Sequence, residues 1–244
     1  MSTISVILPT LNESQNIITL IKEIEDQLTS RNRSFEIIVV DDDSKDLTWK
    51  IVEDYSNSKS NSSPSIKVIR RINERGLTSA LNKGISSANG EIVIWMDCDL
   101  SHPPSIINQL IDGVNDHKNV DGVVASRYVS GGSDARKGQY HFQKFLSFTL
   151  YVLSKWFLHI KVKDITSGYL AIKRQALIDI GLLDGDYGEY FIDMLCKLAK
   201  KNFYIVEIPY TFKNRVLGES KTATNFKGYI VRGKKYLKMI YKYA

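Results

Sequence analysis

The chain has 244 residues and a mass of 27.7 kDa. Its 43% hydrophobic and 25% charged residues are typical of an ordinary globular domain and exclude disordered, collagen-like and coiled-coil chains. The formal net charge is +6, but the excess lies in two segments, 136–163 and 213–244, which together have fifteen basic residues and one acidic residue. The rest of the chain has 18 basic against 26 acidic residues. This distribution argues against a uniformly basic nucleic-acid-binding protein.

Cysteine content and hydropathy bear on the cellular compartment. Cys98 and Cys196 are the only cysteines, too few for a disulfide framework and typical of a reducing compartment. The N-terminus runs directly into an apolar strand, without the pattern of a secretory leader. The most apolar long stretch, 145–160, is interrupted by Ser154 and Lys155 and is shorter than the about 20 residues of a membrane span. We therefore expect a cytoplasmic protein whose contact with the cytoplasmic face of a membrane is peripheral.

Apolar runs alternate with helical patterns along the first hundred residues. The patterns predict strands at 4–8, 35–40, 66–69 and 91–96, with helices at 14–28, 47–56 and 76–88 between them. A further helix after Pro104, a strand at 121–126 and one or two amphipathic helices between 139 and 160 follow. Strands separated by helices favour an α/β fold with a doubly wound, mainly parallel sheet.

Polar residues follow the predicted strands at their carboxyl ends, where ligands bind in such sheets. Glu13 follows the first strand, and Asp97 and Asp99 follow the fourth. Two carboxylates at positions i and i+2 can bind one hard divalent cation and leave coordination positions for the oxygens of a nucleotide diphosphate. They could instead be turn carboxylates before Pro103. Without a cation, however, two adjacent carboxylates would be costly to desolvate. His102, beside two prolines, is interpreted as structural.

The second strand ends in a run of acidic residues, Asp41 to Asp43, with Asp46 close behind. This run could form a second metal site. Alternatively, one carboxylate accepts hydrogen bonds from a nucleoside while the others cap the following helix. The spacing does not match an EF-hand, and we favour Asp42 on the nucleoside.

Cations in the second half of the chain are candidate phosphate ligands. Arg215 and Lys221 flank a glycine, and such a loop can fold over a diphosphate, with Arg as a bidentate fork and Lys as a point charge. It could also be a solvated basic loop. Arg127 after a predicted strand, and Lys144 with Ser147 near a helix start, are further candidates.

Several spaced motifs together carry a resemblance to a known family. They are Pro9 to Glu13, Ile38 to Ser44, Asn89 to Ile92 leading to Asp97 to His102, Ser126 to Tyr128, Asp164 to Tyr169, and Arg215 to Lys221. In these motifs the chain resembles the family 2 glycosyltransferases and, within them, the dolichyl-phosphate (polyprenyl-phosphate) mannose synthases of the soluble catalytic type. The resemblance implies a GT-A fold, a GDP-mannose donor, a Mg²⁺ or Mn²⁺ cofactor and a polyprenyl phosphate acceptor. It also implies inverting transfer to a β-linked lipid-phosphate sugar, peripheral membrane contact, and a small membrane subunit as a partner to be tested.

Carried over by position, the resemblance implies a role for each matching residue. The donor site would comprise Pro9, Leu11, Glu13, Val40, Asp42, Asp97, Cys98, Asp99, Ser101, Arg215 and Lys221. The metal ligands would be Asp97, Asp99 and Ser101, and the acceptor phosphate would contact Arg127, Lys144 and Ser147. Catalytic roles would fall to Asp99, Arg127, Arg215 and Lys221. In one GT-A domain spanning 1–244, residues 1–100 would form the nucleotide-binding half, 101–225 the acceptor and catalytic half, and 226–244 a basic amphipathic segment.

Some positions depart from the family pattern, and alternatives remain open. Leu11 replaces the usual Tyr, and Gln143 stands where an acceptor-binding Arg is expected, so part of that role is assigned to Lys144. The alternative activities are a polyprenyl-phosphate glucosyltransferase using UDP-glucose and another family 2 glycosyltransferase. A non-enzymatic alternative is a nucleotide-sugar binding module. The basic apolar segments 142–160 and 233–242 either lie at a membrane interface or pack on the domain.

Overall fold

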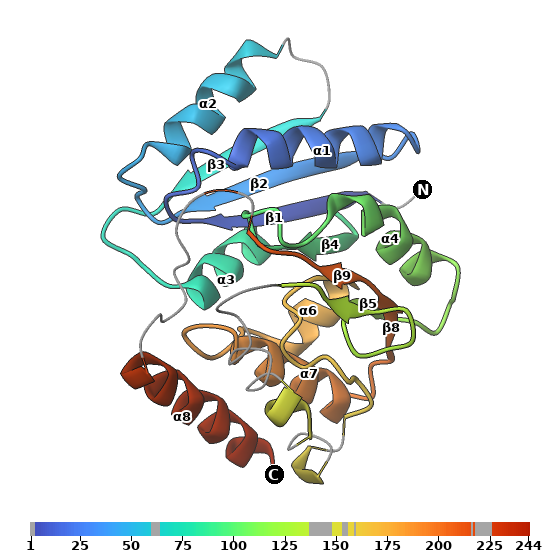
Figure 1. Cartoon of the computed structure of the whole chain (residues 1–244). Helices are drawn as coiled ribbons and strands as arrows, with labels where there is room; N and C mark the ends of the chain where they lie inside the picture. The colour runs from blue at the N-terminus through green and yellow to red at the C-terminus, as the bar shows by residue number, and fades with distance from the viewer. Residues whose placement is uncertain are drawn as a thin grey trace.

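A seven-stranded sheet crosses the computed structural model, which describes residues 3–59, 64–136, 148–152, 156–158, 160–215, 217 and 226–244 (Figure 1). The strand order is β3-β2-β1-β4-β7-β5-β8. The strands are β1 (Ile4–Thr10), β2 (Phe35–Asp41), β3 (Ser65–Arg70), β4 (Ile92–Trp95), β5 (Gly122–Ser126), β7 (Leu170–Lys173) and β8 (Ile205–Pro209). A separate parallel pair joins β6 (Ser133–Asp134) to β9 (Thr211–Phe212).

The pairing directions divide the sheet into two parts. β3, β2, β1 and β4 are parallel neighbours, which confirms the predicted doubly wound arrangement of the first hundred residues. β7 lies between β4 and β5 and pairs antiparallel with both, while β5 and β8 are parallel. The sheet is therefore mainly parallel, with one reversed strand that the sequence pattern does not predict.

Helices cover both faces of the sheet because the side chains of a strand point alternately to either side. Val6 and Leu8 pack in the same apolar cluster as Ile21 of α1, whereas Ile7 packs with Leu81 of α3 in the other cluster. The first face carries α1 (Ile17–Thr29), α2 (Thr48–Ser58), the one-turn helix η1 (Pro104–Ile106) and α4 (Ile107–Asn115). The second carries α3 (Leu77–Ser87), α6 (Arg174–Ile180), α7 (Tyr190–Lys200) and α8 (Phe226–Tyr243).

The C-terminal segment 226–244 forms one helix that packs along the second face. Met239 and Ile240 of α8 are buried in the core cluster of that face, and the Tyr243 hydroxyl donates to Asp193 of α7 at 2.6 Å. Leu237 and Tyr241 remain exposed on the outer side. Within the described part of the chain, no helix combines the length and apolar character needed to cross a membrane.

Candidate functional site

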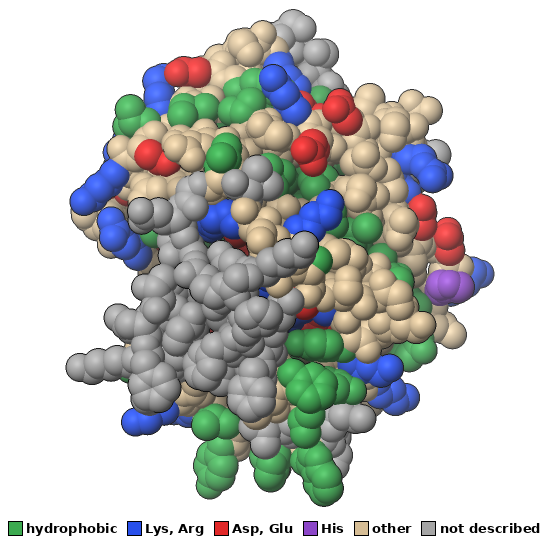
Figure 2. Space-filling view, in the orientation of Figure 1, with side chains coloured by type: hydrophobic (Ala, Val, Ile, Leu, Met, Phe, Trp, Pro, Cys, Tyr) green, Lys and Arg blue, Asp and Glu red, His purple; other side chains and the backbone are tan. Residues whose placement is uncertain are grey.

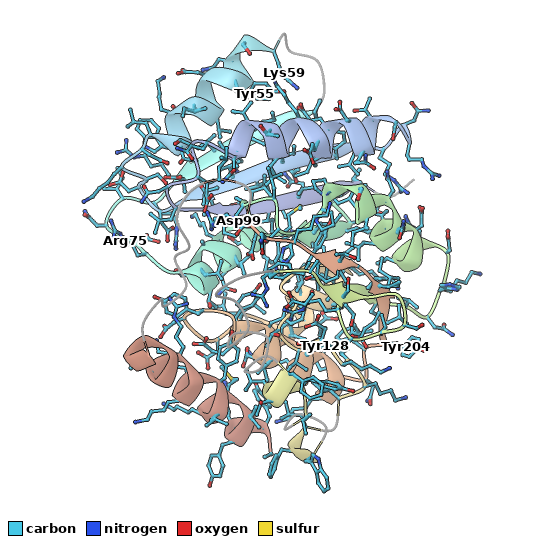
Figure 3. All side chains as sticks on the ribbon, in the orientation of Figure 1. Tyr55, Lys59, Arg75, Asp99, Tyr128 and Tyr204 are labelled. Carbon is cyan, nitrogen blue, oxygen red and sulfur yellow. The ribbon has the colours of Figure 1, made fainter. Side chains whose placement is uncertain are left out.

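The ends of four strands bring polar residues to one edge of the sheet. β1, β2 and β4 are parallel, and β5 runs in the direction of β4 because both are antiparallel to β7. Glu13, Asp42, Asp99 and Arg127 therefore follow strands that end at the same edge, as the sequence predicts. Figure 3 shows Asp99 near the middle of the molecule.

Asp97 and Asp99 leave β4 on a tight turn in which Leu100 has a left-handed backbone, with φ of 62°. The Asp97 side chain is about half exposed, at 51%, and that of Asp99 is 15% exposed. Loss of contact with water to the surrounding protein, and then the negative charge of Asp99, raise the pKa of Asp97 above its usual range. The positive charges of Arg215 and Arg127 oppose this rise. A divalent cation beside the two carboxylates would relieve their repulsion.

Ser101 and Arg215 already contact the two oxygens of Asp99. The Ser101 hydroxyl and backbone N–H donate to Oδ1 at 2.5 and 3.0 Å, and Arg215 Nη2 lies 3.2 Å from Oδ2. The hydroxyl of Ser101 keeps lone pairs that can accept, so these oxygens fit a hard cation such as Mg²⁺ or Mn²⁺. Across the described residues, His, Cys, Asp and Glu side chains do not gather in groups of three or more that could hold a metal ion.

Arg215 comes from the far end of the chain to lie between two carboxylates. Its Nη1 donates to both oxygens of Glu13, at 3.0 Å each. Glu13 is only 6% exposed. Glu13, predicted as a donor contact, thus holds the Arg215 side chain in this structure.

His102 lies beneath the Asp97 turn and is fully buried. Its Nδ1 accepts the backbone N–H of Asp97 at 3.0 Å, and its ring stacks on Tyr169 at a centroid distance of 5.1 Å. Burial lowers the pKa of His102 to about 4, so the ring is neutral at physiological pH. The geometry agrees with the structural interpretation of His102.

Asp42 is bound by a cation that the sequence reasoning missed. Arg71, which directly follows β3, is 4% exposed, and its Nε donates to Asp42 Oδ1 at 2.7 Å. The backbone N–H of Gly76 donates to Oδ2 at 2.9 Å. A nucleoside that contacts Asp42 would therefore meet Arg71 as well. The signal in the sequence is an Arg pair, Arg70 and Arg71, at the end of a predicted strand.

Two predicted donor contacts, Val40 and Cys98, have buried side chains. Val40 is 0% exposed and its side chain lies in the core beneath the sheet. Cys98 is 4% exposed, and its thiol donates to the Pro9 carbonyl at 3.3 Å. The side chains of Val40 and Cys98 thus do not line an accessible surface, because they point into the protein from the strand and the turn. Pro9 and Leu11 are half-buried and remain reachable.

Arg127 is tied to Asp164 by a buried ion pair. Asp164 accepts the Arg127 backbone N–H at 2.9 Å, its Nε at 2.8 Å and its Nη2 at 2.6 Å. Thr166 accepts a further hydrogen bond from Nη2 at 2.8 Å. The charge of Asp164 holds the pKa of Arg127 well above its usual range despite burial. The motif at 164–169, which the sequence analysis recognised without a role, thus positions Arg127.

Three of the predicted phosphate ligands, Lys144, Ser147 and Lys221, lie outside the residues that the structure describes, as does Gln143. Among the described candidates, the structure brings Glu13, Asp97, Asp99, Ser101 and Arg215 together. It places Asp42 with Arg71 at the end of β2, and Arg127 with Asp164 at the end of β5.

Known proteins match both the sequence and the fold. The family described as Glycosyl transferase family 2 matches residues 5–181. A dolichol-phosphate mannosyltransferase from Pyrococcus furiosus is 35% identical over an alignment of 247 positions, which covers 98% of this chain and 63% of that protein. A polyprenol monophosphomannose synthase from Mycolicibacterium smegmatis is 30% identical over 221 residues, 88% of this chain and 79% of that protein. The chain therefore spans less than two thirds of the length of the Pyrococcus relative.

A solved structure shows the same architecture. The glucosyl-3-phosphoglycerate synthase of Mycobacterium tuberculosis, in complex with Mn²⁺, uridine diphosphate and phosphoglyceric acid, superposes with a TM-score of 0.71 at 18% identity, covering 99% of this chain and 78% of that one. The mixed sheet, with its acidic pair after β4, is therefore a GT-A glycosyltransferase fold. The chain belongs to glycosyl transferase family 2.

Proposed function

We propose that the chain transfers a mannosyl residue from GDP-mannose to a dolichyl or other polyprenyl phosphate. The observation that carries the proposal is the group formed by Asp97, Asp99 and Arg215, in a chain that aligns over 98% of its length with a dolichol-phosphate mannosyltransferase. A relative named for polyprenol monophosphomannose synthesis supports the same sugar and the same class of acceptor.

Residues of the first half would bind the donor. Asp42 with Arg71 would contact the nucleoside, and Asp97, Asp99 and Ser101 would hold Mg²⁺ or Mn²⁺ on the diphosphate. When bound, such a cation supplies charge stabilisation for the leaving nucleoside diphosphate. Arg215 would add a second positive charge to the same leaving group.

The second half would bind the acceptor and carry out an in-line displacement. An acceptor phosphate oxygen forms the bond to the anomeric carbon while the bond to the nucleoside diphosphate breaks, which inverts the configuration and gives a β-linked product. Because this oxygen is already anionic at neutral pH, positioning replaces general-base catalysis. Arg127 would guide the phosphate, and Lys144, Ser147 and Lys221 remain proposed contacts. In this scheme 1–100, 101–225 and 226–244 are the nucleotide-binding half, the acceptor and catalytic half, and the basic C-terminal segment.

One end of the molecule is suited to peripheral contact with a membrane. Hydrophobic side chains project at the lower end of the view in Figure 2, near the C-terminus that Figure 1 marks. Two aromatic residues of the described chain, Trp156 and Tyr241, are 80% and 85% exposed. Lys234 and Lys238 lie on the exposed side of α8, where cations near an anionic surface contribute about 1 kcal/mol each. Sedimentation with anionic and zwitterionic vesicles, with and without polyprenyl phosphate, tests this contact. Absence of binding at low salt would refute it.

The activity is tested by transfer from labelled GDP-mannose and UDP-glucose to phytanyl phosphate, with and without Mg²⁺ or Mn²⁺. Metal-dependent product from GDP-mannose alone is expected. Product from UDP-glucose alone would overturn the mannosyl assignment in favour of a glucosyltransferase, and nucleotide binding without transfer to any acceptor would support a binding module.

Asp99→Asn tests the metal role within the chain. Asn keeps the shape of the side chain but removes the charge, so we expect transfer to fall at least about 100-fold, the scale of losing one electrostatic contact to the transition state. Asp112→Asn, on α4 away from this edge, is the matched control and should retain normal transfer. Near-normal turnover of Asp99→Asn would remove the role assigned to this residue.

A further inference from the structure

Asn16 occupies the N-cap position of α1, but its side chain does not cap the helix. Asn is favoured at this position because its side-chain oxygen can accept the N–H of the second or third helical residue. Here no such hydrogen bond forms, although the residue is only 1% exposed. The side chain of a preferred capping residue is thus turned toward other partners.

Those partners are the residues around Arg215. Asn16 Nδ2 donates to Glu13 Oε2 at 3.1 Å and to the carbonyl oxygen of Leu217 at 3.0 Å. Because both partners only accept, they fix the orientation of the amide, with its nitrogen facing them. Glu13 accepts from Arg215 at 3.0 Å, and Arg215 reaches Asp99 at 3.2 Å. One buried amide therefore connects the start of α1 to a segment 201 residues later in the chain.

The oxygen of the same amide is also buried. Among the residues that the structure describes, Asn16 Oδ1 is a buried acceptor without a hydrogen-bond partner, a situation that normally destabilises a protein. The arrangement requires two N–H donors on one nitrogen, which Asn provides and Asp does not. The unpaired oxygen is a consequence of that requirement.

We propose that Asn16 is a positioning residue of the donor site. It holds the Glu13 carboxylate and the backbone at Leu217 so that the Arg215 guanidinium stays beside Asp99. The inference rests on the proposed function only in taking Arg215 and Asp99 as the residues that face the diphosphate. Asn16 itself acts through Glu13 and Arg215.

Asn16→Asp is the sharpest variant because it keeps the size of the side chain. It replaces the donating nitrogen with an oxygen, so both hydrogen bonds are lost and a carboxylate faces Glu13. Since repulsion between the two carboxylates displaces Glu13 and with it the Arg215 side chain, the dissociation constant for GDP with Mn²⁺ should rise about 10- to 100-fold, the scale of hydrogen bonds to charged groups. At saturating donor, kcat should change less than the KM for the donor.

Asn108→Asp is the matched control. Asn108 is 7% exposed and also donates its side-chain nitrogen to a backbone carbonyl, that of Gln27, at 2.7 Å, but it lies on α4, away from the donor edge. Urea unfolding gives the loss of stability for both variants, and only Asn16→Asp should lose affinity for GDP with Mn²⁺. Equal affinity of the two variants would overturn the proposal. If Asn16→Asp does not fold, Asn16→Ala gives the same comparison without the added charge.

A double-mutant cycle tests the route of the effect. In an Arg215→Ala background, Asn16→Asp should change the GDP dissociation constant less than about 2-fold, because residues that act through one another are not additive. An undiminished effect there would show that Asn16 does not act through Arg215. Binding is measured with GDP and with UDP in the presence of Mn²⁺, independently of transfer. If UDP alone binds, the GDP-mannose assignment fails, and the role of Asn16 is then decided with UDP.

Discussion

Asp164→Asn would remove the carboxylate that hydrogen-bonds the buried Arg127 guanidinium, while Asp134 Oδ2, 3.8 Å from Nη1, remains as a more distant counter-charge. The side chains of Arg127 and Asp164 are 5% and 0% exposed, so water cannot replace the lost interaction. Asp164 accepts three hydrogen bonds from Arg127. The side-chain oxygen of Asn can still accept some of these hydrogen bonds, whereas the NH₂ group of Asn would face an N–H group of Arg127, and two donors cannot form a hydrogen bond.

The expected destabilisation follows from this burial. Removing one partner of a buried ion pair costs about 3–5 kcal/mol, and because Asn retains some acceptance we expect about 3 kcal/mol. Asp54→Asn removes a carboxylate that pairs with Lys50 on the surface of α2, where Asp54 is 62% exposed, and should cost less than about 0.5 kcal/mol. The comparison isolates the effect of burial.

Urea unfolding of the metal-free protein measures both free energies. The double variant Arg127→Met with Asp164→Leu should be less destabilised than the sum of the two single variants, because neither charge is then left buried alone. In the transfer assay, Asp164→Asn should raise the KM for the acceptor phosphate, since Arg127 loses its orientation. A loss of less than about 1 kcal/mol for Asp164→Asn would mean that Asp164 does not stabilise the buried charge of Arg127.

Three further changes probe the scaffold of the site. Gly90→Ala would place a Cβ 2.5 Å from the backbone nitrogen of Ser5, so the midpoint of thermal unfolding should drop, with a loss of at least about 2 kcal/mol; an unchanged midpoint would contradict this packing. Tyr190→Phe removes the partner of the Trp95 indole N–H, 3.0 Å away, and should cost about 1–3 kcal/mol in urea unfolding, whereas a neutral result would mean that the indole finds another acceptor. Burial lowers the pKa of His102 from 6.5 to about 4, so between these pH values the unfolded chain binds a proton that the folded chain does not. Compared with His102→Asn, which does not titrate in this range, the free energy of unfolding of the original chain should therefore fall by about 1.4 kcal/mol per pH unit as the pH drops from 6.5 to 4. If the free energies of unfolding of the two proteins change in parallel with pH, the His102 ring is not held in a buried, neutral form.

Most elements of the first hundred residues could be predicted from the sequence. The strands predicted at 4–8, 35–40 and 66–69 appear as β1, β2 and β3, each extended by one or two residues, and β4 lies within the predicted 91–96. These predictions succeed because strand and helix patterns depend on residues close together in the chain. β7 could not be found in this way, since only its pairing with β4 and β5, both distant in sequence, decides its direction and place.

The residues of the candidate site also include some that the sequence could predict and some that it could not. The pair Asp97 and Asp99 could be recognised because both carboxylates belong to one turn after one strand. Arg71 and Asn16 could not, since a sequence does not show that a strand-end Arg turns toward Asp42 or that a helix-capping Asn forgoes its cap. The side chains of Val40 and Cys98, both predicted as donor contacts, are buried in the core.

The sequence by itself determined the family, the alternation of strands and helices, and the acidic pair, because each depends on short motifs or patterns whose residues are close together in the chain. Only the tertiary structure decided which charged side chains form ion pairs with one another. Arg127 pairs with Asp164 across 37 residues, and Arg215 reaches Glu13 across 202 residues. Such pairs form because the parallel strands end at one edge of the sheet, where segments from both ends of the chain meet. A charged side chain that is buried there needs an ionic partner, because water cannot solvate it.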